Sequence, residues 1–218
     1  MSKVNFFVAG SSKSGTTWLY KCLQAHPNVF VPEKDALHFF NLNYHKGTNW
    51  YHQWFRGSEE FPIICDPTPS YIRDAAAAQR IHDYNPDAKL VFLLRNPYDR
   101  LFSHYWHQKR KARIHFEIKD ILGYNEVGNY DLFEIWVRPS LYYEQLKHYV
   151  EHFDQEQLVF FKFEHLQNNP EDLLKQLFEF LNIKPKIDGL PVTQKFNTAQ
   201  KRQTRISRLD KISMRATS

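Results

Sequence analysis

The stretch from Phe6 to Leu23, FFVAGSSKSGTTWLYKCL, decides how this chain folds. An apolar run ends at Gly10, a turn rich in glycine and serine follows, and an amphipathic helix is expected to begin near Gly15. A strand, a glycine-bearing loop and a helix, in this order, form a cradle in which backbone N–H groups and the positive helix end face one anion. The stretch therefore predicts a phosphate-binding loop.

The lysine of this loop does not stand where nucleotide hydrolases have it. Their P-loop reads G-x-x-x-x-G-K-[ST]. Gly10 and Gly15 have that spacing, but Thr16 follows Gly15, and the lysine is Lys13, inside the loop. We therefore expect a loop that binds a phosphate other than the Mg²⁺-bound triphosphate of ATP or GTP.

Length and composition favour one domain that spans residues 1–218 and is long enough to bury a sizeable core. No apolar run approaches the ~20 residues that a membrane helix needs. The start, MSKVNFFVAG, lacks the long apolar stretch of a signal peptide. Two cysteines, Cys22 and Cys65, give no disulfide framework and are expected to be inert core thiols. These features predict a soluble, cytoplasmic protein.

The net charge of +5 is concentrated at the end of the chain, because residues 195–218 carry seven Lys or Arg and one Asp. A basic segment of this kind binds nucleic acid, a membrane surface or an anionic small ligand, or is simply solvated and disordered. No nucleic-acid-binding motif accompanies the charge. We therefore expect no nucleic-acid partner and no membrane span.

Apolar runs alternate with segments of helical periodicity along the chain. The expected strands are residues 4–9, 62–65, 89–94 and 157–163. The expected helices are about 15–25, 47–56, 73–84, 97–112, 140–152 and 170–182. This alternation predicts an α/β fold with a central parallel β-sheet flanked by helices, and a ligand at the carboxyl ends of the strands. Residues 113–138 lack a clear period and are expected to form an irregular insertion near an acceptor site.

A second anion anchor is predicted after the strand at 89–94. A nucleotide hydrolase would normally end such a strand with an Asp that holds Mg²⁺, but here Arg95 follows. Pro97 begins the next helix, so Ser103 lies within its first two turns. Arg95 alone could form a salt bridge with a surface acid, and Ser103 alone could be an ordinary helix serine. Together they indicate a second phosphate site, and the sequence offers no cluster of metal ligands.

Two phosphate motifs in this order resemble those of the sulfotransferases that use 3′-phosphoadenosine-5′-phosphosulfate (PAPS). SKSGTTWL (12–19) resembles their 5′-phosphosulfate loop, and LLRNPYDRLFSHY (93–105) resembles their 3′-phosphate motif. Further similarity to the heparan-sulfate sulfotransferases, above all their N-sulfotransferase branch, lies in HFFNLNYHKGTNWY (38–51), DPTPSYI (66–72) and SLYYEQLKHYVEHF (140–153). The resemblance runs from about residue 5 to about residue 205 and implies a P-loop NTPase-like sulfotransferase fold.

The resemblance also implies a role for individual residues. Lys13 would contact the 5′ phosphate and the oxygen that bridges it to sulfur, and Arg95 and Ser103 would hold the 3′ phosphate. The other implied donor contacts are Ser14, Gly15, Thr16 and Thr17 in the loop, Trp18 against adenine, Tyr142 near the nucleotide, and Lys201 and Arg202, with Arg205 as a third, from a basic loop that closes the site. A core position is the alternative for Trp18.

The implied reaction is in-line transfer of a sulfuryl group to an oxygen or nitrogen of an acceptor, by resemblance a carbohydrate, with PAPS as donor and without a metal. A base must take the acceptor proton. The heparan branch has a glutamate two residues before the position of His38, where this chain has Ala36. We therefore consider Asp35 first, then Glu33 and His38. Pro67 is a second departure from the family pattern, because many relatives have a lysine there. A third departure is that this sequence ends soon after the basic loop.

Two rival functions stay open on the sequence. A P-loop kinase or nucleotide hydrolase is opposed by the position of Lys13 and by Arg95. A non-catalytic nucleotide-binding relative that lost its base is favoured by Ala36 and Pro67. The basic run at residues 109–113 is interpreted as a solvated helix face, with a track for an anionic glycan as the alternative.

Overall fold

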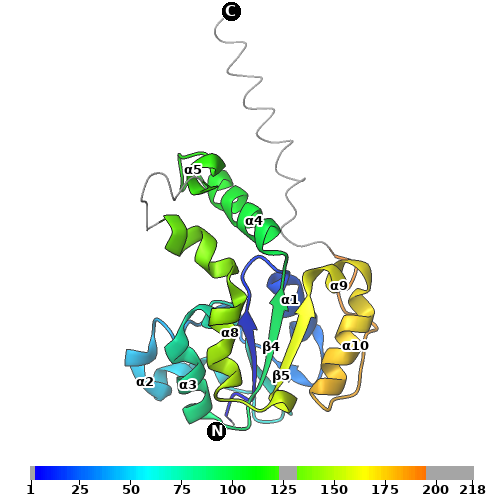
Figure 1. The fold of residues 1–218 in the computed structure, drawn as a ribbon. Helices are drawn as coiled ribbons and strands as arrows, with labels where there is room; N and C mark the ends of the chain where they lie inside the picture. Colours follow the sequence, from blue (N-terminus) through cyan, green and yellow to red (C-terminus); the bar gives the residue numbers. More distant parts are fainter. Residues whose placement is uncertain (1–2, 123–131, 195–218) are drawn as a thin grey trace, which may run out of the picture.

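The structure is a computed structural model that describes residues 3–122 and 132–194. Five strands form a sheet in the order β2-β3-β1-β4-β5, and each neighbouring pair is parallel (Figure 1). The strands are β1 (Phe6–Gly10), β2 (Val29–Phe30), β3 (Ile63–Asp66), β4 (Lys89–Leu94) and β5 (Leu158–Lys162). The predicted parallel α/β fold is confirmed.

Helices connect the strands and cover both faces of the sheet (Figure 1). The α-helices are α1 (Thr16–Ala25), α2 (Gly47–His52), α3 (Ala75–Tyr84), α4 (Pro97–Arg110), α5 (Ile118–Leu122), α8 (Tyr142–Val150), α9 (Phe163–Asn168) and α10 (Pro170–Phe180). Shorter helical segments are η1 (Tyr44–Lys46), η2 (Gln53–Phe55), η3 (Tyr71–Arg73), the π-helical η4 (Phe133–Val137), η5 (Arg138–Ser140) and η6 (Gln155–Gln157). None of the helices within the described ranges is long and apolar enough to cross a membrane.

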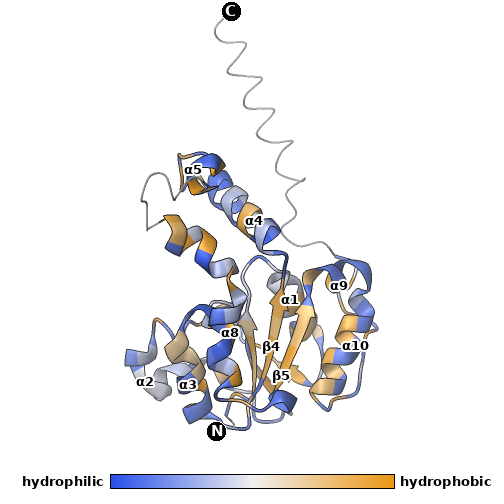
Figure 2. Cartoon of the chain, in the orientation of Figure 1, coloured by the Kyte–Doolittle hydropathy of each residue, from blue (hydrophilic) through white to orange (hydrophobic). Residues whose placement is uncertain are grey.

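Alternate residues of the central strands pack into two separate cores. Phe6 and Val8 of β1 face α1 and α10, whereas Phe7 and Ala9 face α3 and α8. Strands buried on both sides read as continuous apolar runs, which is why β1 and β4 stand out in the sequence. Figure 2 shows these strands as the hydrophobic centre between helices with hydrophilic outer faces. Cys22 and Cys65 are buried and unpaired, as expected for core thiols.

Short elements account for the differences from the predicted pattern. β2 has only two residues, too few to show a period of two. α9 begins at Phe163, inside the run that was predicted to be one strand at 157–163. The predicted helix at 47–56 consists of α2 followed by η2. The predicted insertion at 113–138 contains α5 and η4, and its residues 123–131 lie outside the described part of the chain.

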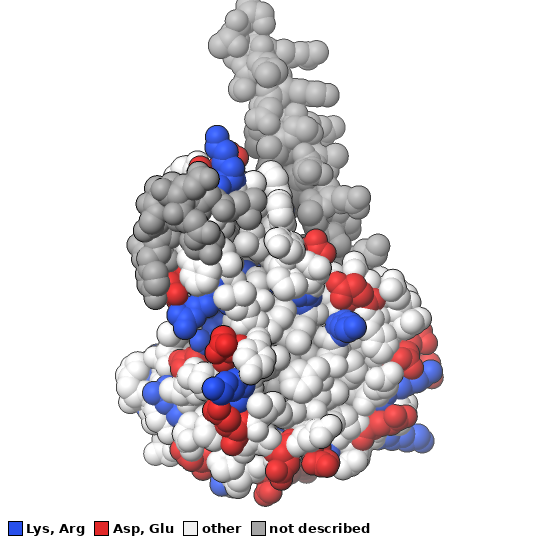
Figure 3. All heavy atoms as spheres, in the orientation of Figure 1, with Lys and Arg blue, Asp and Glu red and all other residues white. Residues whose placement is uncertain are grey.

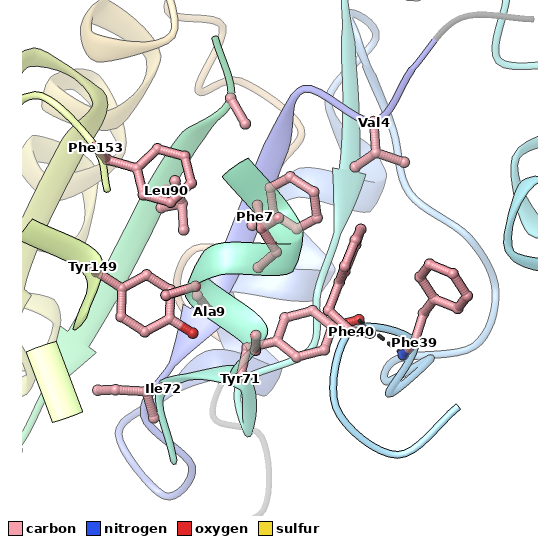
Figure 4. Packing of buried hydrophobic residues seen from close by; sticks show 14 of the residues in the cluster. Val4, Phe7, Ala9, Phe39, Phe40, Tyr71, Ile72, Leu90, Tyr149 and Phe153 are labelled. Carbon is pink, nitrogen blue, oxygen red and sulfur yellow. Dashed lines mark hydrogen bonds between the residues drawn. The ribbon is translucent and has the colours of Figure 1, made fainter. Parts of the chain in front are cut away.

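A buried carboxylate accepts hydrogen bonds at the carboxyl edge of the sheet. Asp66, the last residue of β3, is fully buried and accepts hydrogen bonds from Tyr51 Oη and Tyr71 Oη, both at 2.8 Å, and from Thr68 Oγ1. Burial raises the pKa of Asp66 to about 6, although these hydrogen bonds favour the charged form. Tyr71 Oη also accepts from the backbone N–H of Phe39, at 3.0 Å (Figure 4). Tyr71 therefore links β3 to the loop that follows β2.

We expect the substitution Tyr71→Phe to lower the free energy of unfolding by roughly 1–3 kcal/mol, because it leaves a buried carboxylate and a buried N–H short of a partner. Urea denaturation followed by circular dichroism measures the change. Tyr98→Phe is the matched control, since Tyr98 is 72% exposed. Equal stabilities of the two variants would contradict the role given to the Tyr71 hydroxyl.

Candidate functional site

The loop between β1 and α1 has a backbone that two glycines make possible. A Cβ at Gly10 would lie 2.8 Å from Cβ of Ile72. Gly15 has φ of +91°, and a Cβ there would lie 2.7 Å from Leu166 Cδ1. Lys13 is also in the left-handed region, with φ of +76°, although it is not a glycine. Such strained backbone occurs most often at functional sites.

Hydrogen bonds tie this loop to the neighbouring strand β4. Ser11 donates from its backbone N–H to the carbonyl of Leu93 at 2.8 Å. The hydroxyls of Ser11 and Ser14 hydrogen-bond to each other at 2.7 Å, so the buried Ser14 side chain stabilises the loop from inside. Tyr142 Oη donates to the carbonyl of Arg95 at 3.0 Å. The predicted nucleotide contact Tyr142 therefore lies behind the loop, where it joins α8 to the end of β4.

The two helices that begin at this edge differ at their N-termini. The N-cap of α1 is Gly15, which has no side chain to accept from the first amides, and the first turn contains no acid. The N-cap of α4 is Asn96, whose Oδ1 accepts from the N–H groups of Tyr98 and Asp99. Since the N-terminus of a helix attracts anions, α1 presents an anion site, whereas the capped end of α4 does not.

Three adjoining cavities surround this edge, and we name them by the helices beside them. The α1 cavity, of about 300 Å³, lies over the N-terminus of α1. It brings together seven of the predicted donor contacts: Lys13, Gly15, Thr16, Thr17, Trp18, Arg95 and Ser103. His107 and Arg110 of α4 also line it. Trp18 is otherwise buried in the core and donates from Nε1 to the carbonyl of Val192 at 3.0 Å.

Arg95 is held with its guanidinium group at the α1 cavity. Its Cζ lies 4.5 Å from the centre of the Phe163 ring, and Nη1 donates to the carbonyl of Lys13 at 3.3 Å. Its Nε is buried and has no hydrogen-bond partner among the described residues. Within that same part of the chain Arg95 forms no salt bridge, so the alternative of a surface ion pair is not supported. An unpaired buried donor of this kind fits an anionic ligand.

Lys13 lies in a strongly cationic environment. Burial is the main cause that lowers its pKa to about 8, and the positive charges of Lys111, Arg110 and Arg100 contribute to the same shift. Among the described residues that line the α1 cavity, Lys13, Arg95 and Arg110 are cationic and none is acidic. Such a site binds an anion, and the charge of that anion would raise the pKa of Lys13 again.

The α4 cavity, of about 150 Å³, continues from the α1 cavity, with which it shares Ser12, Lys13 and His107. Its wall also contains His104, whose pKa falls to about 3, while that of His107 falls to about 4. Burial is the main cause in both cases, and nearby cations add to it. Both imidazoles are therefore neutral near pH 7.

Arg100 joins the two sides of the α4 cavity. It is buried, and it donates from Nε to Ser140 Oγ at 2.5 Å and from Nη2 to the carbonyl of Trp136 at 2.8 Å. The sequence analysis missed Arg100 and the two histidines as site residues. For His107 a signal existed, because it lies one helical turn after Ser103 and so on the same side of α4.

The three predicted bases lie apart from the cavities. Glu33 and Asp35 are exposed. Neither they nor His38 line the α1 cavity, the α4 cavity or a third cavity beside α8. His38 is half-buried, with Nδ1 2.9 Å from Ser70 Oγ. Lys201 and Arg202, predicted to close the donor site, lie outside the described residues. Over residues 3–122 and 132–194, no group of three or more His, Cys, Asp or Glu is placed to hold a metal ion.

Comparison with known proteins agrees with this geometry. The family model described as "Sulfotransferase domain" matches residues 3–216. A bifunctional heparan sulfate N-deacetylase/N-sulfotransferase of Drosophila melanogaster is 30% identical over 209 residues, covering 84% of this chain and 20% of that protein. The human heparan sulfate glucosamine 3-O-sulfotransferase 6 is 29% identical over 177 residues, covering 81% and 52%. This chain thus spans about half, or less, of the curated relatives it matches.

Among solved structures, a sulfotransferase from Alicyclobacillus acidocaldarius superposes with a TM-score of 0.79 at 27% identity. The match covers 94% of this chain and 90% of that one. An anion-binding loop with an internal lysine, a second cation at the end of the adjacent strand, and a family match over nearly the whole length lead to one conclusion. This chain belongs to the sulfotransferase family.

Proposed function

We propose that this sulfotransferase moves a sulfuryl group from PAPS to a hydroxyl or amine of a carbohydrate acceptor. The observation that carries the proposal is the pair of anion anchors around the α1 cavity. Lys13 follows β1, and Arg95 follows the adjacent strand β4. Ser103 lies in α4, the helix after Arg95, and all three residues line the α1 cavity. Two separate anchors suit a nucleotide with distinct 5′ and 3′ phosphates better than one with a single triphosphate chain.

Lys13 is suited to the transfer step because it lines both the α1 and the α4 cavity. In the reaction, the acceptor atom forms a bond to sulfur while the bond from sulfur to the 5′-phosphate oxygen breaks. Negative charge then accumulates on the leaving phosphate, and a fixed cation beside it lowers the barrier. Lys13 supplies that charge, and the N-terminus of α1 adds its own.

The proton of the acceptor needs a group that is neutral and close to the transfer point, and His107 fits this description. It lines both cavities, together with Lys13, and its ring is unprotonated near pH 7. The anionic donor beside it would raise its low pKa and so make it a better proton acceptor. Asp35 is the alternative that the sequence favours, and it would have to reach the acceptor from an exposed loop.

We expect His107→Gln to lower kcat by about 10²-fold or more, which is typical for the loss of a general base. Asp35→Asn should stay within a few-fold of the unchanged protein. The dependence of kcat on pH separates a base from a structural residue. A base makes kcat fall at low pH, where it is protonated, and this fall should be absent from the variant that lacks the base. If Asp35→Asn proves the slower enzyme, the loop supplies the base and His107 does not.

A carbohydrate acceptor is the part of the proposal that rests on the relatives. The Drosophila melanogaster and human relatives are both named as heparan sulfate sulfotransferases. Hydrogen-bonding side chains of the α4 cavity, among them Ser12, His104 and Gln108, suit the hydroxyls of such an acceptor.

The deciding experiment combines donor binding with sulfate transfer. The desulfonated nucleotide, 3′-phosphoadenosine-5′-phosphate, should bind in the presence of EDTA, whereas ATP with Mg²⁺ should bind weakly. Labelled sulfate from PAPS should then pass to members of a broad panel of saccharides. Binding that requires Mg²⁺ would favour a kinase or nucleotide hydrolase. Nucleotide binding without transfer to any acceptor would favour the non-catalytic relative that Ala36 and Pro67 suggest.

A further inference from the structure

The third cavity continues the path away from the donor side. The α8 cavity, of about 590 Å³, lies between η3, the η4–η5 segment and α8. It shares Ile72, Arg73 and Pro139 with the α4 cavity, but it shares no lining residue with the α1 cavity. The three cavities therefore follow one another, with Lys13 at the first junction and Arg73 at the second.

The charge of the lining changes along this path. Lys13, Arg73 and Arg100 line the α4 cavity without an acid among the described residues. The α8 cavity instead has two arginines, Arg73 and Arg138, and two glutamates, Glu134 and Glu144. Figure 3 shows acidic and basic side chains close together over α8. The α8 cavity thus has no excess of positive charge.

The arginines of the α8 cavity already interact with acids of the same cavity. Arg138 Nη1 lies 2.6 Å from Glu134 Oε2. Burial lowers the pKa of Arg73, and the charge of Glu134 partly opposes this shift. A polyanionic chain would gain little from the paired Arg138 and would be repelled by the glutamates. Apolar surface from Phe133 and Leu141, mixed with hydrogen-bonding groups, suits the faces and hydroxyls of sugar rings instead.

None of the cations in the basic run after Ser103 (Lys109, Arg110, Lys111 and Arg113) lines the α4 or the α8 cavity. Lys109 Nζ forms a salt bridge with Glu117 at 2.7 Å, and Arg110 lines the α1 cavity on the donor side. The strongest positive charge therefore surrounds the donor phosphates and the transferring group. The α8 cavity, at the far end of the path, has as many glutamates as arginines in its lining.

We propose that the α8 cavity binds the non-reacting units of an uncharged oligosaccharide acceptor, whose reacting end reaches Lys13 through the α4 cavity. This inference rests on the proposed sulfotransferase function and defines its acceptor class. A cavity of this size lies in the range of roughly 300–1,000 Å³ that holds drug-sized ligands, so it accommodates more than one sugar ring. Affinity should accordingly increase with acceptor length.

The test uses the protein saturated with 3′-phosphoadenosine-5′-phosphate and isothermal titration calorimetry. The neutral probes are malto-oligosaccharides, cello-oligosaccharides and N-acetylglucosamine oligosaccharides of one to six units. A heparosan hexasaccharide is the polyanionic probe. In at least one neutral series, we expect the hexasaccharide to bind about tenfold or more tightly than the monosaccharide, and more tightly than heparosan. Ala75→Trp, which narrows the α8 cavity from its rim, should remove the gain with length.

Ala76→Trp is the matched control, because Ala76 is equally exposed on the first turn of α3 but does not line the cavity. Equal behaviour of the two variants, or no binding by any neutral series, would overturn the proposal. Preferential binding of heparosan would overturn it as well, and transfer of sulfate to heparosan would then leave the proposed sulfotransferase function intact. Failure of nucleotide binding itself would instead count against the proposed function.

Discussion

Replacing Lys13 with alanine is expected to lower kcat for sulfate transfer by about 10³-fold, the scale seen when a group that stabilises transition-state charge is removed. Among the described residues that line the cavities, Lys13 is the only cation shared by the α1 and α4 cavities. Charge develops on the leaving phosphate at that junction, so no neighbouring arginine can replace it. Thermal stability should not fall, because burial and the neighbouring cations disfavour the charged lysine in the folded state.

Lys13→Arg is the control, with nucleotide affinity measured from pH 6.5 to 9.5. The pKa of Lys13 is about 8, so the unchanged protein should bind the nucleotide about tenfold more weakly for each pH unit above 8 and uniformly below it. The reason is that binding requires the protonated amine, which is lost as the pH rises. Arginine stays charged throughout, and Lys13→Arg should show no such decline. A flat profile for the unchanged protein would show that Lys13 does not contact the phosphate.

Arg95→Ala is expected to weaken nucleotide binding by about 10²-fold, which corresponds to the loss of charge-assisted hydrogen bonds worth ~1.5–3 kcal/mol. At saturating donor, kcat should stay within a few-fold, because Arg95 lines the α1 cavity and not the α4 cavity. The split between affinity and turnover distinguishes a binding residue from one that acts on the transition state.

A second nucleotide makes the Arg95 experiment specific. The two nucleotides to compare are PAPS and adenosine-5′-phosphosulfate, which differ only in the 3′ phosphate. Adenosine-5′-phosphosulfate lacks that phosphate, so it should bind equally to the unchanged protein and to Arg95→Ala. The difference between the two nucleotides then measures the interaction of Arg95 with the 3′ phosphate alone. If Arg95→Ala weakened both nucleotides to the same extent, the residue would support the loop through Lys13 without contacting the phosphate.

The parts of the site that the sequence predicted are those in which neighbouring residues act together. The loop around Lys13 and the strand that ends at Arg95 each carry their chemistry within a few residues. Parallel strands then bring both to one edge, so their meeting at the α1 cavity follows from the predicted sheet.

The acceptor side could not be predicted in this way, because its residues come from distant and irregular segments. Arg73 belongs to η3, whereas His107 belongs to α4 and Pro139 to η5. Each of these residues lies just outside a stretch that resembles the family, and η4 is a π-helix whose period no amphipathic pattern reveals. The family resemblance therefore points to the loop near Asp35 for the base, although neither Asp35 nor Glu33 lines any of the three cavities.

Arg100 joins the two sides on which we propose that donor and acceptor bind. Its guanidinium group connects α4, which carries the predicted phosphate contact Ser103, to Trp136 and Ser140 beside the proposed acceptor path. If the two substrates bind as we propose, this link fixes the distance between their sites before either substrate arrives. We therefore expect the enzyme to select its acceptor by length.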